Sequence, residues 1–505
     1  MKTILATLLL SLLAVAGQPA KEPAAKPKFV DYESELNDKL GKGIAPEKNA
    51  NVLLFKVFGP KPEGGKMADG YFKRLGIEEP PETGDYFVGI GKFLSDHLQL
   101  QREEFEDIFN QMALSHRHPW AAKDYPIIGA WIKQNEKPLI ALHEAVNRPQ
   151  YYNPLVSRKT ADDDPGSLIA ALLPSVQKCR ELASLIVARA MLRLHEGKTE
   201  EAWADLMAAH RLARHVAHGG TLIESLVGIA IESIASNADL AFLEHAKLNS
   251  KQVQEKLKDL QTLPAFPTIA EKIDLTERYV FLDCLNMVRR GGFATVQGLA
   301  GAAGGATNQP TPEELKALEG LDWEPAIKKG HAFYDRLTAA LRLPTRAERK
   351  RELDKIEAEL QVIKLAVGDK IAQLVPGKDP GPLVVQSIGD VLLTLLAPAI
   401  QKVSDARDRY EQIHSNLQIA FAMAAYRLDE GRYPAKLDDL APKYLAKVPG
   451  DVFSGKPLIY KPEGKGYLFY SVGANGLDEG GRWYDDEPRG DDPRVRMPLP
   501  PLKKE

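Results

Sequence analysis

The 505-residue sequence predicts a mainly helical protein, a helical bundle, that ends in a small α+β module. Between residues 86 and 407, apolar side chains recur every three or four positions, which is the period of an amphipathic helix. Alanine, leucine, glutamate, lysine and arginine, all good helix formers, fill these segments. Near the C-terminus the pattern changes to two short strand-like runs separated by a glycine-containing turn, which is typical of a β-hairpin. We therefore expect two regions of different fold class.

The N-terminus has the composition of a secretory signal peptide. Lys2 supplies a positive charge, and the uncharged, mostly apolar segment 4–16 ends in small residues. This segment is shorter than the roughly 20 apolar residues that a membrane-spanning helix requires. We predict a signal peptide, residues 1–16, that is cleaved near Ala16-Gly17. The mature chain is then exported to the periplasm or the extracellular space and has no membrane span.

Residues 17–50 are predicted to form a linker or irregular segment, and residues 51–404 a mainly helical domain. The clearest helices are expected at 87–114, 166–197, 198–218, 222–245 and 269–290. Gly197 favours a left-handed helix end, and the helical hairpin around it has a tetratricopeptide-like pattern. Residues 291–312 are rich in Gly, Ala, Thr and Pro, so they are predicted to form a flexible loop.

Charge and cysteine content exclude several classes of protein. The 66 Lys and Arg residues are balanced by 69 Asp and Glu residues, whereas nucleic-acid-binding proteins need a concentrated basic surface. We therefore expect no nucleic-acid partner. The 2 cysteines are too few for a cysteine-rich zinc or iron–sulfur site. Cys179 and Cys284 lie in apolar helical stripes, so they are either buried thiols or, in an oxidising compartment, a disulfide.

Histidine pairs in the helical domain have spacings that metal ligands can adopt. His116 and His118 are one residue apart, and His215 and His218 are three apart on one helix face. No third ligand is identifiable for either pair, and both lie near predicted helix ends. A structural role is therefore the alternative that we favour for them.

Two acidic residues interrupt the apolar helix predicted at 222–245. Glu224 and Glu232 are suited to acid–base chemistry if they are buried, or to ion pairs with Arg211 or Arg214 of the preceding helix. The pairing is the interpretation that we favour. The sequence contains no nucleophile elbow, zinc-protease motif or phosphate-binding lysine motif, so no catalytic residue is predicted.

Residues 405–505 are predicted to form the C-terminal module. An amphipathic helix extends to Gly431, with apolar residues at three- and four-residue spacing. Two strand-like segments, 458–460 and 467–472, follow and are joined by a hairpin turn. The chain then closes with an acidic, glycine-rich tail. This order predicts a helix packed on a small antiparallel sheet.

Three segments of this module carry a family resemblance: Tyr426–Pro434 (Tyr-Arg-Leu-Asp-Glu-Gly-Arg-Tyr-Pro), Asp451–Gly455 and Tyr470–Gly476 (Tyr-Ser-Val-Gly-Ala-Asn-Gly). In this order they resemble the globular region of the major pseudopilins of type II secretion systems. The resemblance is confined to the C-terminal region, because the N-terminus lacks the prepilin leader and assembly helix of that family. The whole chain also looks like uncharacterised exported proteins of planctomycete-type bacteria, a similarity that implies no activity.

The pseudopilin resemblance implies a calcium site in the loop after the last strands. The family aspartate in the Gly-Ala-Asp-Gly position is Asn475 here, and an amide oxygen remains a usable ligand for calcium. The candidate ligands for calcium are Asn475, Asp478, Asp485, Asp486 and Asp491, with Asp492 adjacent. Arg482, Arg489 and Arg494 are interspersed among them, so an ion-paired tail without metal is the alternative.

Together these features predict an exported, non-enzymatic structural or interaction protein that carries a pseudopilin-like C-terminal module. Its expected partner is a protein of the cell envelope or the secretion machinery. A helical scaffold that binds a peptide or small ligand is the alternative. An exported hydrolase with a site assembled from scattered residues is a further one. Calcium is the only cofactor that we expect.

Overall fold

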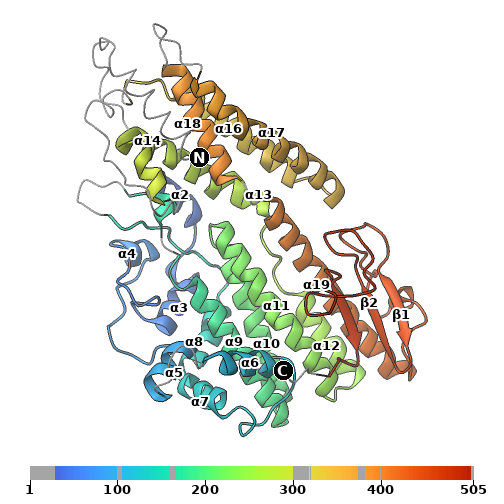
Figure 1. Cartoon of the computed structure of the whole chain (residues 1–505). Coiled ribbons are helices and arrows are strands. Elements are labelled where there is room, and N and C mark those ends of the chain that lie inside the picture. Colours follow the sequence, from blue (N-terminus) through green and yellow to red (C-terminus); the bar gives the residue numbers. More distant parts are fainter. Residues whose placement is uncertain are drawn as a thin grey trace.

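The computed structural model describes residues 29–98, 105–159, 166–171, 173–299, 318, 320–372, 381–397 and 400–501. The protein is mostly helical, with a small three-stranded antiparallel sheet near the C-terminus (Figure 1). The predicted mainly helical fold class is therefore confirmed at this level. The predicted signal peptide lies outside the described residues.

The N-terminal part of the chain consists of short helices, most of which lie along one side and the lower end of the central bundle, while α2 lies beside α14 (Figure 1). They are α2 (Tyr32–Leu40), η1 (Pro46–Lys48), α3 (Ala50–Phe58), α4 (Tyr71–Leu75), α5 (Ile90–Leu98), α6 (Phe105–Ser115), α7 (Pro126–Gln134) and α8 (Glu136–Val146). The prediction of an irregular segment at 17–50 is wrong for α2. Asp31 caps this helix by accepting from the Ser34 N–H, and Leu36 is buried, a pattern too short to be recognised by periodicity.

A central bundle of long helices follows. It contains η3 (Leu168–Ala170), α9 (Val176–His195), α10 (Thr199–His218), α11 (Leu222–His245) and α12 (Ser250–Gln261), and α10 packs against both α9 and α11. Thr221 and Glu224 form a capping box at the start of α11, each side chain bonding the backbone N–H of the other residue. Gly197 has φ 79° and reverses the chain between α9 and α10, as the predicted hairpin requires.

A second helical layer occupies the upper part of the molecule in Figure 1. It consists of α13 (Ile269–Lys272), the π-helical turn η4 (Ile273–Glu277), α14 (Arg278–Leu299), α16 (Glu324–Leu341), α17 (Arg346–Ala372) and α18 (Gly381–Leu396). The prediction of a loop from residue 291 is wrong up to 299, because α14 continues through this segment. A glycine inside a helix lowers the stability of the helix by only about 1 kcal/mol relative to alanine, so a long helix can extend through a segment that contains glycine. Residues 300–312 lie outside the described residues.

The C-terminal region comprises α19 (Ile400–Glu430), η5 (Leu437–Leu440), β1 (Ile459–Glu463), β2 (Gly466–Tyr470) and β3 (Arg494–Met497). β1 and β2 form the predicted hairpin, with Ile459 opposite Tyr470 and Glu463 opposite Gly466. β3 pairs with the other edge of β2, so the strand order is β1-β2-β3. The third strand was not predicted, because its sequence Arg-Val-Arg-Met is short and half charged.

Two hydrophobic clusters form most of the core. The larger one joins the N-terminal helices, the central bundle, α19 and the sheet, while the other lies among α14, α16, α17 and α18. Phe421 of α19 is buried against Trp203 of α10, with ring centroids 5.8 Å apart. The predicted boundary at 405 therefore does not separate two cores: the C-terminal module shares its core with the central bundle.

Cys179 and Cys284 are both buried free thiols. They belong to different hydrophobic clusters, so the disulfide alternative is not formed. Burial raises the pKa of both thiols, that of Cys284 to about 12. This environment keeps the thiols protonated and unreactive.

Two stretches in the described part of the chain are long and apolar enough to cross a bilayer by length and composition. They are α11 and the stretch Leu383–Glu430, which includes residues 398–399 outside the described ones. In their most apolar windows, 56% of the residues of α11 and 69% of those of the second stretch are buried inside the protein. Burial of this extent is what a core helix shows.

Candidate functional site

The long connection between β2 and β3 brings acidic residues together beside the sheet. Gly473 begins this loop with φ 66°, and a Cβ atom at this position would lie 2.3 Å from the backbone oxygen of Asp491. Only glycine permits both the positive φ and this approach. The two ends of the loop therefore lie against each other.

Three carboxylates converge where the ends of the loop meet. Glu479, Asp491 and Asp492 each offer one ligand atom, and these atoms lie within 4.8 Å of one another. Asp492 is 0% exposed, while the other two are partly exposed. A buried acid beside two partly exposed acids forms a negatively charged cluster with access to solvent.

Backbone N–H groups fix these carboxylates through one oxygen each. Oδ2 of Asp492 accepts from the N–H groups of Glu479 (3.0 Å) and Gly481 (2.8 Å). Oδ2 of Asp491 accepts from the N–H groups of Ala474 (2.9 Å) and residue 475 (3.2 Å). The Oδ1 atoms of both aspartates are buried and have no hydrogen-bond partner among the described residues. Buried oxygens of this kind need a ligand or a water molecule, so these two oxygens are available to coordinate a cation.

The electrostatics of the cluster also favour a cation. Burial raises the pKa of Asp492, two loop N–H groups partly offset this, and the neighbouring Glu479 and Asp478 carboxylates raise it further. A bound cation would remove the repulsion between the carboxylates. The ligand atoms are all oxygens, which hard cations such as Ca²⁺ and Mg²⁺ prefer, and calcium needs six to eight of them. Backbone carbonyls and water would complete the shell.

Of the five residues predicted as ligands, the structure places only Asp491 in this cluster. Asp485 and Asp486 form ion pairs with Arg494, as the metal-free alternative expected. Asp478 accepts from the Tyr470 hydroxyl (2.9 Å). Asn475 accepts from the Leu477 N–H through its side chain (2.7 Å) and so closes a local turn instead.

Sequence reasoning missed Glu479 as a member of this cluster, whereas it named Asp492 as a further oxygen source beside the five candidate ligands. One signal was available: both acids lie within two residues of a glycine, in Glu479-Gly480-Gly481 and Gly490-Asp491-Asp492. Glycine lets the backbone approach closely enough for the two segments to meet. Their spacing of more than ten residues carries no periodic pattern, so the convergence emerges only from the fold.

A second polar cluster lies inside the central bundle. His210 of α10 is fully buried between two acids of α11: its Nδ1 is 2.9 Å from Glu232 and its Nε2 is 2.6 Å from Asp239. Arg214 donates to Glu232 (2.6 Å), which confirms the favoured pairing of this acid with an arginine. His414 of α19 lies 3.4 Å from the same carboxylate.

The charges of this cluster compensate one another. Burial alone would lower the pKa of His210, but the carboxylates of Glu232 and Asp239 outweigh it and raise the pKa to about 9. Burial raises the pKa of Glu232, but His210 and Arg214 hold it well below its usual range. The cluster joins α10, α11 and α19, and all of its members except the partly exposed His414 are buried. Its geometry supports a structural role.

The other sequence candidates have structural partners. Glu224 caps α11 and accepts from the Asn153 side chain (2.8 Å), and Arg211 donates to Asn147 instead of to an acid. Each histidine of the predicted pairs has its own polar contact: His116 with the Ser184 carbonyl, His118 with the Tyr125 hydroxyl, His215 with the Val146 carbonyl and His218 with the Arg214 carbonyl. Among the described residues, neither pair belongs to a cluster that could hold a metal ion.

Comparison with protein families, curated proteins and solved structures finds no match to this chain.

Proposed function

We propose that this protein is an exported, non-enzymatic structural or interaction protein whose C-terminal module is stabilised by a divalent cation, Ca²⁺ in the compartment to which it is exported. The observation that carries the proposal is the convergence of Glu479, Asp491 and Asp492, with two buried carboxylate oxygens that lack a hydrogen-bond partner in the described part of the chain. Extracellular calcium sites work with dissociation constants of roughly 0.1–1 mM, which a site of this charge would match.

The architecture around the site supports a pseudopilin-like module. A long helix, α19, packs on a three-stranded antiparallel sheet, and the acidic loop joins β2 to β3. This is the arrangement that the sequence resemblance implies. Because α19 also belongs to the central core, we propose that the module acts as a fixed part of the whole protein.

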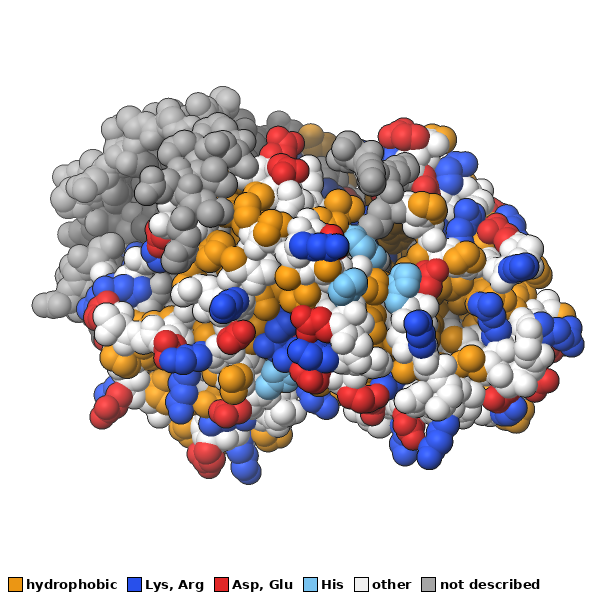
Figure 2. Space-filling model, turned by 90° about the horizontal axis from the view of Figure 1, so that it is seen from below, with side chains coloured by type: hydrophobic (Ala, Val, Ile, Leu, Met, Phe, Trp, Pro, Cys, Tyr) orange, Lys and Arg blue, Asp and Glu red, His pale blue; other side chains and the backbone are white. Residues whose placement is uncertain are grey.

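The loop presents apolar side chains that a protein partner would bind. Leu477 is 64% exposed and Tyr484 is 45% exposed, and both lie in the connection that carries the three carboxylates. A cation that orders this loop would also order its apolar surface. Basic and acidic side chains are mixed over the face seen in Figure 2. A mixed surface of this kind is consistent with a protein partner and not with a polyanion, which would need a basic patch. We expect the partner to be a protein of the cell envelope or the secretion machinery.

Thermal unfolding of the mature chain tests the metal site. At about 10 mM Ca²⁺, a dissociation constant of roughly 0.1–1 mM would stabilise the native state by about 1–3 kcal/mol relative to chelator. Asp492→Asn should abolish this difference. Asp485→Asn is the matched control, because Asp485 pairs with Arg494 outside the cluster. The same melting temperature in calcium and in chelator would refute a calcium site.

Capture of partners from the native envelope tests the interaction role. The full mature chain should retain a specific partner in calcium and lose it in chelator, and the double variant Leu477→Ser, Tyr484→Ser should lose it in both. Leu428→Ser is the control, because Leu428 is an exposed leucine of α19 outside the loop. Deleting residues 405–505 is unsuitable, because this would open the shared core. An identical set of retained proteins for all variants would contradict the interaction role.

A further inference from the structure

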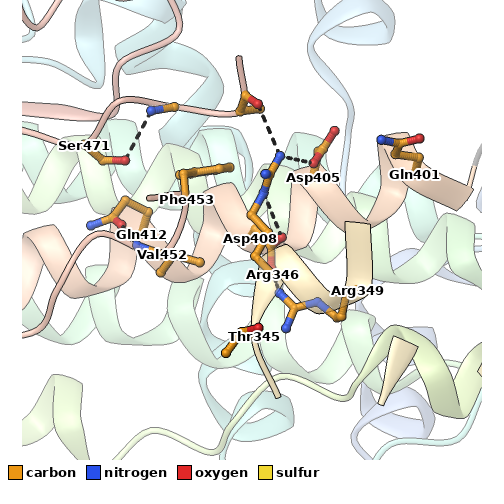
Figure 3. Close-up of polar contacts among 12 residues, drawn as sticks. Thr345, Arg346, Arg349, Gln401, Asp405, Asp408, Gln412, Val452, Phe453 and Ser471 are labelled. Carbon is orange, nitrogen blue, oxygen red and sulfur yellow. Dashed lines mark hydrogen bonds and ion pairs between the residues drawn. The ribbon is translucent and has the colours of Figure 1, made fainter. Parts of the chain in front are cut away.

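Arg346, the first residue of α17, connects the second helical layer to the C-terminal module. Its guanidinium donates to Asp405 of α19 (2.7 Å) and lies 3.4 Å from Asp408 of the same helix. The same group donates to the backbone oxygen of Ala474 in the acidic loop (3.2 Å). Figure 3 shows Arg346 between α19 and the backbone of this loop. One side chain thus joins α17, to which it belongs, with α19 and with the acidic loop, although these segments are far apart in the sequence.

The contact with Ala474 leads directly to the carboxylate cluster. The N–H of Ala474 donates to Oδ2 of Asp491, whose Oδ1 is one of the two buried oxygens for which the described residues supply no hydrogen-bond partner. Arg346 therefore binds the carbonyl of the peptide unit 474–475, and Asp491 accepts from the N–H of this same unit and from the N–H of the preceding one. Movement of this turn would rotate the Asp491 carboxylate relative to Glu479 and Asp492.

The surroundings of Arg346 keep its side chain in one position. Only 11% of the side chain is exposed, and its guanidinium lies over the Phe453 ring at 4.9 Å from the centroid. Thr345 and Glu348 cap the start of α17 and so fix the backbone of Arg346. Arg349 forms an additional ion pair with Asp408, but among the described residues it makes no hydrogen bond or ion pair with the acidic loop. A guanidinium held this firmly can position what it binds.

We propose that Arg346 is a positioning residue of the metal site and couples cation binding to the packing of α17 on α19. The inference depends on the proposed calcium site. Three carboxylates repel one another in the metal-free protein, so a fixed 473–475 turn lowers the cost of holding Asp491 in the cluster. By reciprocity, a bound cation tightens the contacts of Arg346 with the loop and with α19.

A charge effect acts in the opposite direction. The positive charge of Arg346 repels a cation, but Asp405 and Asp408 neutralise it locally. Removal of the arginine would leave one unbalanced negative charge, because Arg349 still pairs with Asp408, and this charge would attract calcium from a distance. At about 0.15 M salt the screening length is roughly 8 Å, so this effect falls off steeply, whereas the hydrogen bond to Ala474 is direct. The loss of positioning should therefore outweigh the charge effect, so that removal of Arg346 weakens calcium binding.

Calorimetric titration of Ca²⁺ into the full mature chain tests this inference. Arg346→Ala should weaken calcium binding by roughly 5-fold or more, within the usual range of coupling between sites. Arg349→Ala is the matched control: it also removes an arginine from Asp408 but leaves the loop contact intact, so its affinity should stay within about 2-fold of wild type. Arg346→Lys keeps the charge without the forked donors and should not restore the affinity.

Hydrogen exchange supplies the reciprocal readout. Calcium should slow exchange at amides of the first turns of α17 in the wild-type chain, and this protection should disappear in Arg346→Ala. Unchanged or tighter calcium binding in Arg346→Ala would overturn the positioning role while leaving the calcium site standing. If the wild-type chain takes up no calcium at all, the proposed site and this inference both fail. Metal-free melting temperatures of the two alanine variants establish that they are equally folded.

Discussion

Replacement of His210 by leucine should destabilise the protein strongly, because this ring is the only hydrogen-bonding partner of the Asp239 side chain among the described residues. The variant would leave Asp239 in a fully buried position without a counter-charge. Removal of one partner from a buried ion pair typically costs about 3–5 kcal/mol. The pKa of His210 gives a separate measure: a rise from 6.5 to about 9 corresponds to about 3 kcal/mol of preference for the charged ring.

The pH dependence distinguishes lost charge from lost packing. The pKa of His210 is higher in the folded state than in the unfolded chain, so its contribution is complete below pH 6.5 and is lost as the pH rises through about 9. Between these values the wild-type protein should therefore lose up to about 3 kcal/mol of stability that His210→Leu does not lose. The pKa of Glu232 is lowered in the folded state, so the pH dependence of its contribution to stability is opposite. This contribution is present at neutral pH and is lost only as the pH falls into the acid range.

Urea unfolding followed by circular dichroism at several pH values measures both effects. His195→Leu is the control, because His195 is an exposed histidine at the end of α9, where a substitution should change stability by no more than about 0.5 kcal/mol. If His210→Leu costs less than about 1 kcal/mol at pH 7, or keeps the wild-type pH profile, the cluster does not stabilise the bundle through charge.

Three further predictions concern the core, the loop and the thiols. Phe421→Ala should cost about 3–5 kcal/mol and leave a single unfolding transition, because the ring lies in the core shared by both regions; separate melting of the C-terminal module would contradict this. Gly473→Ala should cost about 1–3 kcal/mol and weaken calcium binding, because its Cβ would overlap the Asp491 backbone; a titration indistinguishable from wild type would exclude this role for the glycine. Cys179 and Cys284 should resist a thiol reagent in the native state and both react in denaturant without reductant, whereas a missing thiol would indicate a disulfide.

Predictions from local sequence succeeded where neighbouring residues determine the structure. The helices of the central bundle follow from apolar periodicity, and the hairpin of β1 and β2 follows from strand-like residues on either side of a glycine turn. The pairing of Glu232 with Arg214 was also predictable, because both lie on successive helices with a short connection. These features depend on interactions between residues that are close in the sequence, so they can be predicted without knowledge of the tertiary structure.

The acidic tail shows what sequence could not determine. Every acid in it is chemically suited to bind calcium or to pair with an arginine, and only the path of the loop separates the two roles. The fold pairs Asp485 and Asp486 with Arg494, whereas it brings Asp491 and Asp492 to Glu479. Composition predicted an oxygen-rich loop, but which acids converge in it depends on the approach of two glycine-containing segments.

By itself, the sequence determined that this chain is mainly helical, where its long helices lie, and that a hairpin and an acidic glycine-rich loop follow them. Only the tertiary structure decided that α19 shares the core of the central bundle, that His210 lies between two acids, and that Arg346 reaches the loop. The physical reason is the distance along the chain over which each kind of interaction acts. Helix period, caps and turns act over a few residues, whereas burial and charge pairing depend on which distant segments the closed core brings into contact.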